Sequence, residues 1–568
     1  MRPYQELLSG DGKATASTWA RMRSDCRGTQ ESVLMSILEA ASHSEFGRSH
    51  GFSGITTIEG FREAVPISEY SDFSGYIDRM AAGETDMLFD GATEYFISTS
   101  GTTGKSKLIP ESAAGKEAKE AVNKVRNAAM TRAITEAILG SPSAMAMMAS
   151  KGLDLKGSGV ADMAGKFHFY SVTSAMAGRT TEGGIEIGYA SGKTFDGSEF
   201  SGMLAYPKEL MGLQDGEAAM YLTMLFALRY DDVIIVTSNN AARFYARVVH
   251  AQENAERIIE DMRNGTIDPG LVLTDEERRM AEGYMAPDPE RADQLQAILD
   301  SGRENFTPRN YWPNLLAARF WLSGSVGVNV PRVRPLLPEG TVLFDMGYGA
   351  SEARINIPRT PGSGSGTLAT FSAFYEFIPV GGDEVLTADQ LEAGGQYELI
   401  VTNYSGLYRY RLNDIIVVRG FDGDTPDIEF LTKSREILNI AQEKVPASGV
   451  LECVGRMAAE LGFGVRQAQV RENLEAQAYD VYIEPEGRTD VPTAEMSERL
   501  DGLLRGSYDL YDRNRMFGSL NGPIVTIMRD GWQESMFAER EAQGAPRSQI
   551  KLDARAMSVP DERWVLRR

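Results

Sequence analysis

Ser98-Thr99-Ser100-Gly101-Thr102-Thr103-Gly104-Lys105-Ser106-Lys107 is a loop pattern rich in glycine, serine and threonine. An apolar strand pattern, Tyr95 to Ile97, precedes it, and Leu108 to Pro110 resumes a strand before a long helical pattern from Lys116. Glycines let a backbone approach phosphate closely, while hydroxyls and a lysine supply donors and charge. The stretch therefore predicts a flexible strand-to-strand loop that wraps a triphosphate.

A second interpretation of this loop compares it with the phosphate loop of P-loop NTPases, because Gly104-Lys105-Ser106 resembles the end of that motif. The motif requires a glycine where this chain has Thr99, and a helix must follow it at once. Neither condition is met. A solvated turn rich in serine and threonine remains the alternative without a ligand.

Outward from the loop, the chain alternates buried strand and helix patterns. Val233 to Val236 is typical of a buried parallel strand, and Ser238-Asn239-Asn240 can cap a helix that runs to about Met262 and stops at Asn264-Gly265. Val342 to Phe344 repeats the strand pattern. The glycine-rich stretch Pro361 to Gly366 is expected to form a hairpin loop before a strand from Phe371 to Pro379.

Two domains are predicted. Strand patterns follow Tyr397, and the polar segment Ser434-Arg435-Glu436 resembles a hinge. Helix and strand patterns beyond it indicate a small α+β domain. We expect an α/β protein with a large N-terminal domain of sheets flanked by helices, residues 1–435, and a smaller mobile α+β C-terminal domain, residues 436–568.

Composition excludes several classes of protein. The 568 residues carry 58 basic and 80 acidic side chains, a formal net charge of −22, so binding to nucleic acid or to an anionic membrane is not expected. No apolar run approaches the length of a membrane span. Cys26 and Cys453 cannot form a disulfide framework, and the four histidines stand singly. These features favour a cytoplasmic location.

Two motifs resemble the adenylate-forming superfamily, which includes acyl-CoA ligases, nonribosomal adenylation domains and luciferases. Ser100-Gly-Thr-Thr-Gly-x-x-Lys107 is similar to its phosphate-binding signature. Tyr348-Gly349-Ala350-Ser351-Glu352 is similar to its second motif, whose aromatic ring stacks on adenine and whose glutamate helps to hold magnesium. The chemistry agrees, because stacking requires only a π face and a hard cation prefers a carboxylate. A turn with a surface glutamate is the alternative for the second motif.

A third motif narrows the resemblance to the Gretchen Hagen family of acyl-acid amido synthetases, as a bacterial-type member. Gly406 to Asp414 is similar to its Tyr-Arg-Tyr-Arg-x-Gly-Asp run, whose aspartate binds the ribose hydroxyls. Asn413 replaces the glycine and can still adopt a left-handed backbone. Arg409 and Arg411 can instead form structural ion pairs. Glu45 to Gly51, Tyr311 to Leu315, and Tyr375 to Pro379 also resemble the family, whereas the C-terminal part does so least.

The resemblance implies that ATP and Mg²⁺ are used to adenylate a small carboxylic acid, with release of pyrophosphate, and that an amino acid amine then forms an amide. A monomer is expected. The implied nucleotide-binding residues are Thr99, Ser100, Gly101, Thr102, Thr103, Lys107, Tyr348, Gly349, Ser351, Glu352, Asp414 and Lys444. Lys444 and Lys551 are the implied catalytic residues, Glu352 the metal ligand, and Arg126, Met130 and Ser325 the acyl-acid contacts.

Two other functions stay open. An acyl-CoA or carrier-protein ligase shares the first half-reaction and uses a thiol acceptor. A nucleotide-binding or scaffold protein without enzymatic activity would keep the fold alone.

Overall fold

The computed structural model describes residues 2–9, 12–99, 107–140, 142–150, 166–172, 179–188, 201–213, 215–323, 330–380, 382–433, 437–486, 490, 492–542, 554–556 and 558–566. The chain divides into two compact units, one with Met1–Thr99 and Leu108–Leu431 and the other with Ser100–Lys107 and Thr432–Arg568. The expected α/β class is confirmed. The hinge at 434–436 lies outside the described residues, so the boundary at 435/436 stays a prediction.

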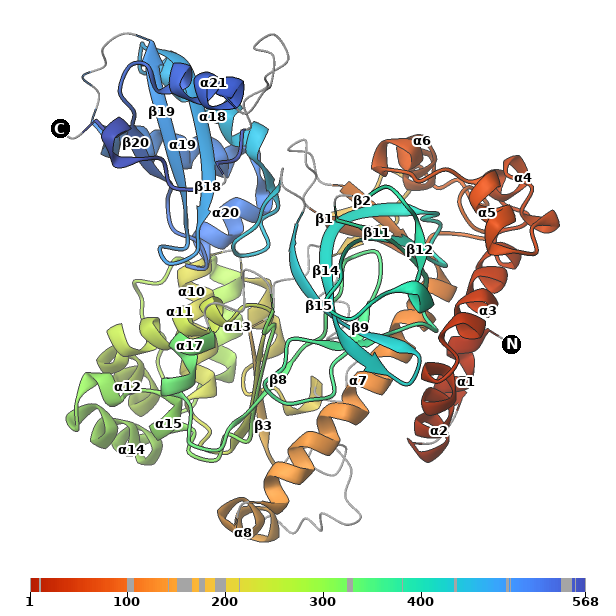
Figure 1. Cartoon of the computed structure of the whole chain (residues 1–568). Helices are drawn as coiled ribbons and strands as arrows, with labels where there is room; N and C mark the ends of the chain where they lie inside the picture. The colour runs from red at the N-terminus through yellow and green to blue at the C-terminus, as the bar shows by residue number, and fades with distance from the viewer. Residues whose placement is uncertain are drawn as a thin grey trace. The chain divides into compact units, whose positions relative to one another are not determined.

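The first unit contains a four-stranded parallel sheet (Figure 1). Its order is β3 (His168–Val172), β6 (Val233–Ser238), β7 (Ala317–Phe320) and β8 (Val342–Asp345). All six residues of β6 are buried, as a parallel strand covered on both faces requires. The strands predicted at Val233 and Val342 are therefore confirmed.

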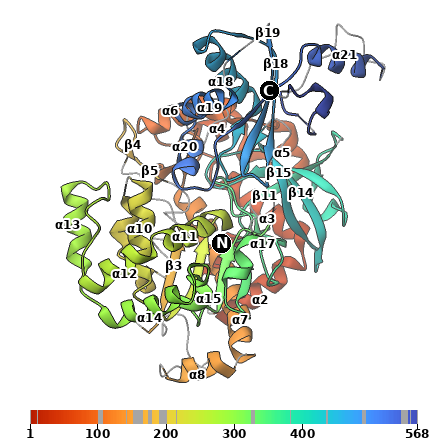
Figure 2. The same ribbon diagram turned by 90° about the vertical axis from the view of Figure 1, so that its left-hand side faces the viewer.

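Helices α10 (Gly216–Ala227), α12 (Ala255–Asn264) and α14 (Pro289–Asp300) pack side by side in the first unit (Figure 2). Asn240 caps α11 (Ala241–Glu253) by accepting the Ala242 N–H, as predicted. The single helix predicted to reach Met262 is wrong, because the chain breaks at Asn254. The Asn254 side chain donates to the His250 carbonyl at 2.9 Å and competes with the helical backbone there.

The first unit also contains a seven-stranded sheet with antiparallel strand pairs. Its order is β12 (Leu386–Thr387), β11 (Phe374–Pro379), β13 (Gln396–Thr402), β14 (Tyr410–Asp422), β15 (Thr425–Lys433), β10 (Gly366–Leu368) and β9 (Asn356–Ile357). Strands β9 and β10 pair as the predicted glycine-rich hairpin. Strand β11 begins at Phe374 rather than Phe371, because the Gln30 amide binds the backbone of Thr370, Ala373 and Tyr375.

A third sheet has the order β2 (Lys107–Glu111), β1 (Tyr95–Thr99), β5 (Glu186–Gly188) and β4 (Arg179–Thr180). The phosphate-loop candidate is thus followed by a strand, as predicted, and then by α7 (Ala113–Leu139). Helices precede this sheet in the chain: α1 (Pro3–Ser9), α2 (Gly12–Arg23), α3 (Cys26–Glu39), α4 (Glu45–Ser49), α5 (Ile58–Ala64) and α6 (Tyr70–Ala81).

The second unit has a hydrophobic core of its own between helices and a small sheet. Strand β18 (Gly464–Asn473) runs antiparallel to β19 (Ala478–Glu486), which is parallel to β20 (Ile524–Ile527). Its helices are α18 (Ala447–Glu460), α19 (Thr493–Ser507), α20 (Asp509–Met516) and α21 (Trp532–Ala542). No helix within the described part of the chain is long and apolar enough to cross a membrane.

Candidate functional site

The segment Asp345–Asn356, called the Tyr348 loop, leaves the carboxyl end of strand β8 and is held by buried polar side chains. The Asp345 carboxylate accepts the N–H groups of Leu322 and Gly347, each at 2.6 Å. The Asn356 side chain accepts the Tyr348 N–H at 2.8 Å. Because ligands bind where chains leave the carboxyl ends of parallel strands, this is the expected place for a site.

Arg126 supports the same loop from helix α7. It is 6% exposed, and its guanidinium donates to the carbonyl oxygens of Tyr348 at 2.7 Å and Asn356 at 2.8 Å. Burial lowers the pKa of Arg126 to about 9. Gly347 has φ +85, and a Cβ there would lie 2.5 Å from Arg126 Cζ. The guanidinium and the loop therefore approach so closely that only glycine fits.

Two residues from different motifs meet at the hydroxyl of Tyr348. This hydroxyl donates to Asp414 Oδ2 at 2.5 Å, and both side chains are buried. Burial, followed by the charge of Asp414, raises the pKa of the Tyr348 hydroxyl well above its ordinary value. Asn413 has φ +57, so the left-handed backbone expected in place of glycine is confirmed. The structure thus brings together the residues predicted to bind adenine and ribose.

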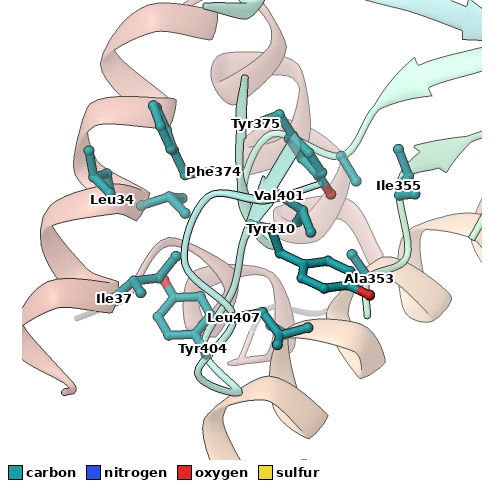
Figure 3. Packing of buried hydrophobic residues seen from close by; sticks show 14 of the residues in the cluster. Leu34, Ile37, Ala353, Ile355, Phe374, Tyr375, Val401, Tyr404, Leu407 and Tyr410 are labelled. Carbon is teal, nitrogen blue, oxygen red and sulfur yellow. The ribbon is translucent and has the colours of Figure 1, made fainter. Parts of the chain in front are cut away.

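Glu352 lies at the tip of the Tyr348 loop, where Gly349 pairs with Arg354 across a tight turn. It is 8% exposed. Its charge contributes to the raised pKa of Tyr348 after burial and Asp414, and to that of Tyr410 after burial. The Glu352 carboxylate therefore shares one neighbourhood with the Tyr348–Asp414 pair. Figure 3 shows buried side chains that pack near this turn, including Ala353, Ile355 and Tyr410.

A buried ion pair ties the turn to the strand that follows the phosphate-loop candidate. Glu111, at the end of β2, is 0% exposed and pairs with Lys119 of helix α7. Lys119 also donates to the Ser351 carbonyl at 2.8 Å, and Ser405 donates to Glu111 at 2.6 Å. Sequence analysis missed these residues, because no local pattern relates positions so far apart in the chain.

The arginines of the third motif form ion pairs. Arg409 is buried against Glu376 at 2.8 Å, and Arg62 contacts the same carboxylate at 2.8 Å. Arg411 lies 3.1 Å from Glu398. The ion pairs that the alternative interpretation expects of Arg409 and Arg411 are therefore present.

The remaining predicted residues are placed as follows. Thr99 ends β1, and Lys107 begins β2 and is half-buried. Met130 is 1% exposed and packs in a core cluster with Phe169 and Ile235. In the second unit, Lys444 is half-buried in the turn between β16 (Ile437–Leu438) and β17 (Val445–Pro446). Ser100, Gly101, Thr102, Thr103, Ser325 and Lys551 lie outside the described residues.

Asp345, Asn356 and Trp321 complete the list of residues that sequence analysis missed. Trp321 Nε1 donates to the Gly347 carbonyl at 2.9 Å. Asp345 ends a predicted buried strand directly before the second motif, so its position was a usable signal. Asn356 gave none.

Comparisons with known proteins agree over most of the chain. Residues 17–171 and 157–342 match the GH3 family N-terminal domain, and residues 366–433 match the GH3 family central domain. A jasmonoyl–L-amino acid synthetase of Nicotiana attenuata, JAR6, is 26% identical over 451 residues, which cover 74% of this chain and 71% of that protein.

An indole-3-acetic acid-amido synthetase of Arabidopsis thaliana, GH3.4, is 24% identical over 557 residues, 92% of this chain and 88% of that protein. The solved structure of the GH3.15 acyl acid amido synthetase in complex with 2,4-DB matches with a TM-score of 0.65 at 20% identity. The match covers 96% of this chain and 94% of that one. The two folds are therefore alike.

Proposed function

We propose that this chain, which belongs to the GH3 family, is an ATP-dependent acyl-acid amido synthetase. It adenylates a small carboxylic acid and then joins the acyl group to an amino acid. The observation that carries this proposal is the meeting of Tyr348, Asp414 and Glu352 in one buried site. By their names, the two relatives described above are a jasmonoyl–L-amino acid synthetase and an indole-3-acetic acid-amido synthetase.

The first half-reaction overcomes the poor reactivity of a carboxylate. A carboxylate oxygen attacks the α-phosphorus of ATP, and the bond to the bridging oxygen breaks with release of pyrophosphate. In this proposal Asp414 accepts hydrogen bonds from the ribose hydroxyls. It also fixes the Tyr348 ring, which is assigned to adenine, through the hydroxyl contact. Holding the reactants in this alignment converts an encounter in solution into an oriented displacement.

The second half-reaction forms the amide. The amine of the amino acid attacks the acyl carbonyl, AMP leaves with the oxygen that came from the acid, and the amine loses a proton. The general base for that proton is not assigned. The buried contacts of Arg126, Asp345 and Asn356 keep the Tyr348 loop in place through both steps.

Glu352 fits a magnesium ion that takes most of its ligands from ATP and water. Mg²⁺ is commonly held by one or two carboxylates together with substrate phosphates. The ion would be Mg²⁺, held by Glu352, and would neutralise charge on the phosphates when bound. Within the described ranges there is no cluster of three acidic, histidine or cysteine ligands, and this arrangement does not require one.

Further residues belong to the proposal through the resemblance. The nucleotide would also be bound by Thr99, Ser100, Gly101, Thr102, Thr103, Lys107, Gly349, Ser351 and Lys444. Lys444 and Lys551 would meet charge on the α-phosphate. Met130 and Ser325 would contact the acid, and Arg126 would do so in addition to its contacts with the Tyr348 loop.

The setting of the reaction is also proposed. We place a bacterial-type monomer in the cytoplasm, divided at 435/436 into a large domain and a mobile cap. The net charge of −22 and the buried free thiols of Cys26 and Cys453 agree with a reducing compartment and with partners that are small molecules rather than nucleic acid or membrane.

The test is AMP formation that depends on an acid, measured with a panel of amino acids and separately with coenzyme A. Aryl, indolyl and aliphatic acids are screened first by pyrophosphate exchange. Amide formation with an amino acid is expected. Turnover with coenzyme A alone would favour the thiol ligase, and absence of ATP binding with every acid would favour a scaffold.

A further inference from the structure

The turn that carries Lys444 has an unusual backbone. It spans Asn439–Lys444 and joins strands β16 and β17, which pair through Leu438 and Val445. Gln442 has φ +77 and Lys444 has φ +49, so two residues that are not glycine lie in the left-handed region. This region is unfavourable for a residue with a Cβ atom. Such a backbone persists only where surrounding contacts fix it, and it is common at functional sites.

A buried carboxylate between these two residues supplies those contacts. Glu443 is 0% exposed, and it accepts the N–H groups of Ile440 at 2.7 Å and Ala441 at 2.6 Å. The Tyr479 hydroxyl donates to the same carboxylate at 2.7 Å, and Asn514 donates to the Ala441 carbonyl at 2.7 Å. We call Glu443, Tyr479 and Asn514 the Glu443 clamp.

The clamp shapes the turn from inside the second unit. Tyr479 lies on strand β19 and Asn514 on helix α20, and each is 1% exposed. The Glu443 side chain thus points into the core, while its neighbour Lys444 stays half-buried. Three donors converge on this carboxyl group: the N–H groups of Ile440 and Ala441 and the hydroxyl of Tyr479. Glu443 therefore fixes the backbone of the turn from which Lys444 extends.

We infer that Glu443 is a positioning residue, whose clamp fixes the strained turn that presents Lys444 to the reacting phosphates. This inference rests on the proposed function, because the role of Lys444 belongs to it. Any substitution that opens the turn should therefore abolish the contribution of Lys444 to the reaction, while the second unit stays folded.

The chain offers a matched control in the same unit. Glu484 is also 0% exposed and accepts two backbone N–H groups, Gly531 at 2.9 Å and Gln533 at 2.6 Å. Its two backbone donors lie at the start of helix α21, and it also pairs with Arg466 at 3.4 Å. Glu443→Gln and Glu484→Gln each keep the side-chain volume and replace one carboxylate oxygen with an amide nitrogen.

The experiment measures both half-reactions separately: adenylate formation from ATP and acid, then amide formation from supplied acyl adenylate and amine. Glu443→Gln should slow the half-reaction that Lys444→Ala slows, by roughly 10- to 100-fold. Glu484→Gln should change that half-reaction by less than roughly threefold. The double variant with Lys444→Ala should be no slower than Lys444→Ala alone, since both act through one ammonium group.

Several results would overturn the inference. Equal losses of half-reaction rate in Glu443→Gln and Glu484→Gln would do so. Rate losses that multiply in the double variant would also do so, as would a Lys444→Ala variant with full activity in both half-reactions. If Glu443→Gln does not fold, Tyr479→Phe removes one bond of the clamp and should slow the same half-reaction less.

Hydrogen exchange separates this inference from the proposed function. The Ile440 and Ala441 amides should exchange faster in Glu443→Gln and remain protected in Glu484→Gln, whatever the enzyme catalyses. A wild-type protein that makes no adenylate would contradict the proposed function. Unchanged exchange at both amides would contradict the clamp alone.

Discussion

The Tyr348 loop and the turn of Lys444 are both fixed by buried charged side chains that bind backbone groups, but they differ in how many residues share that work. The Tyr348 loop is held by Asp345, by Asn356 at its end and by Arg126 of helix α7. In the turn of Lys444, one carboxylate accepts both N–H groups.

Single substitutions should therefore act differently in the two segments. A loop whose contacts come from several independent residues keeps its shape when one contact is lost, whereas loss of Glu443 removes both N–H bonds of its turn at once. In the Tyr348 loop, large effects should therefore come from steric conflict or from removal of a residue that contacts substrate. The predictions below test that expectation, from the largest effect to the smallest.

Gly347→Ala should break the Tyr348 loop most severely. Gly347 has φ +85, and a Cβ would lie 2.5 Å from Arg126 Cζ. Strain and overlap together should lower the free energy of unfolding by about 2–4 kcal/mol. Gly340 is the matched control, because it has φ +86 and no atom within 4 Å of an added Cβ. Gly340→Ala should lose only about 1–2 kcal/mol. Urea unfolding compares them, and equal losses would contradict the close approach of Arg126.

Asp414→Ala should weaken ATP binding by about 1.5–3 kcal/mol, because it removes a charged acceptor proposed for ribose. It also frees the Tyr348 hydroxyl. Tyr348→Phe removes only that hydroxyl and should weaken ATP binding by about 1 kcal/mol. Calorimetric titration with ATP measures both. If the folded Asp414→Ala protein bound ATP as tightly as wild type, the ribose assignment would be wrong.

Glu352→Gln should raise the magnesium concentration needed for half-maximal adenylation by about tenfold, since the amide keeps the shape but lacks the charge that holds a hard cation. Asn403 donates to the Glu352 backbone carbonyl at 2.9 Å, so the turn itself should be unaffected. An unaltered magnesium titration, with unfolding unchanged, would remove Glu352 from the metal site.

The smallest effect should come from the titration of Asp345. Burial raises the pKa of its carboxyl to about 7, above the ordinary value of 3.8. Between about pH 4 and pH 7, the folded chain therefore binds one more proton at Asp345 than the unfolded chain does. The contribution of this proton to the free energy of unfolding is complete below about pH 4 and is lost as the pH rises through about 7. From pH 6 to 8, wild type should lose on the order of 1 kcal/mol more of its free energy of unfolding than Asp345→Asn. Parallel stability curves would contradict this.

The sequence predicted those parts of the site that lie in contiguous motifs. Tyr348, Glu352 and Asp414 were singled out because their motifs resemble those of the adenylate-forming superfamily and the Gretchen Hagen family, and Asn413 has the expected left-handed backbone. Buried strands such as Val233–Ser238 were found by their unbroken apolar run.

The supporting contacts could not be predicted in the same way. Arg126 binds the carbonyl of Asn356, and Glu111 accepts from Ser405, across hundreds of residues. Such pairs depend on how the sheets pack, which no local period records. The helix break at Asn254 also depends on a single side chain that competes for one carbonyl. The sequence pattern of the flanking helices gives no sign of it.

The path of the acid's oxygen atoms tests whether the reaction passes through an acyl adenylate. An acid labelled with ¹⁸O in both carboxyl positions is incubated with ATP and an amino acid that supports turnover, and the products are weighed by mass spectrometry. Attack of the carboxylate on the α-phosphorus predicts one ¹⁸O in each AMP and one in each amide. AMP without the label, or label in inorganic phosphate with ADP as product, would contradict an acyl adenylate and the function proposed for this chain.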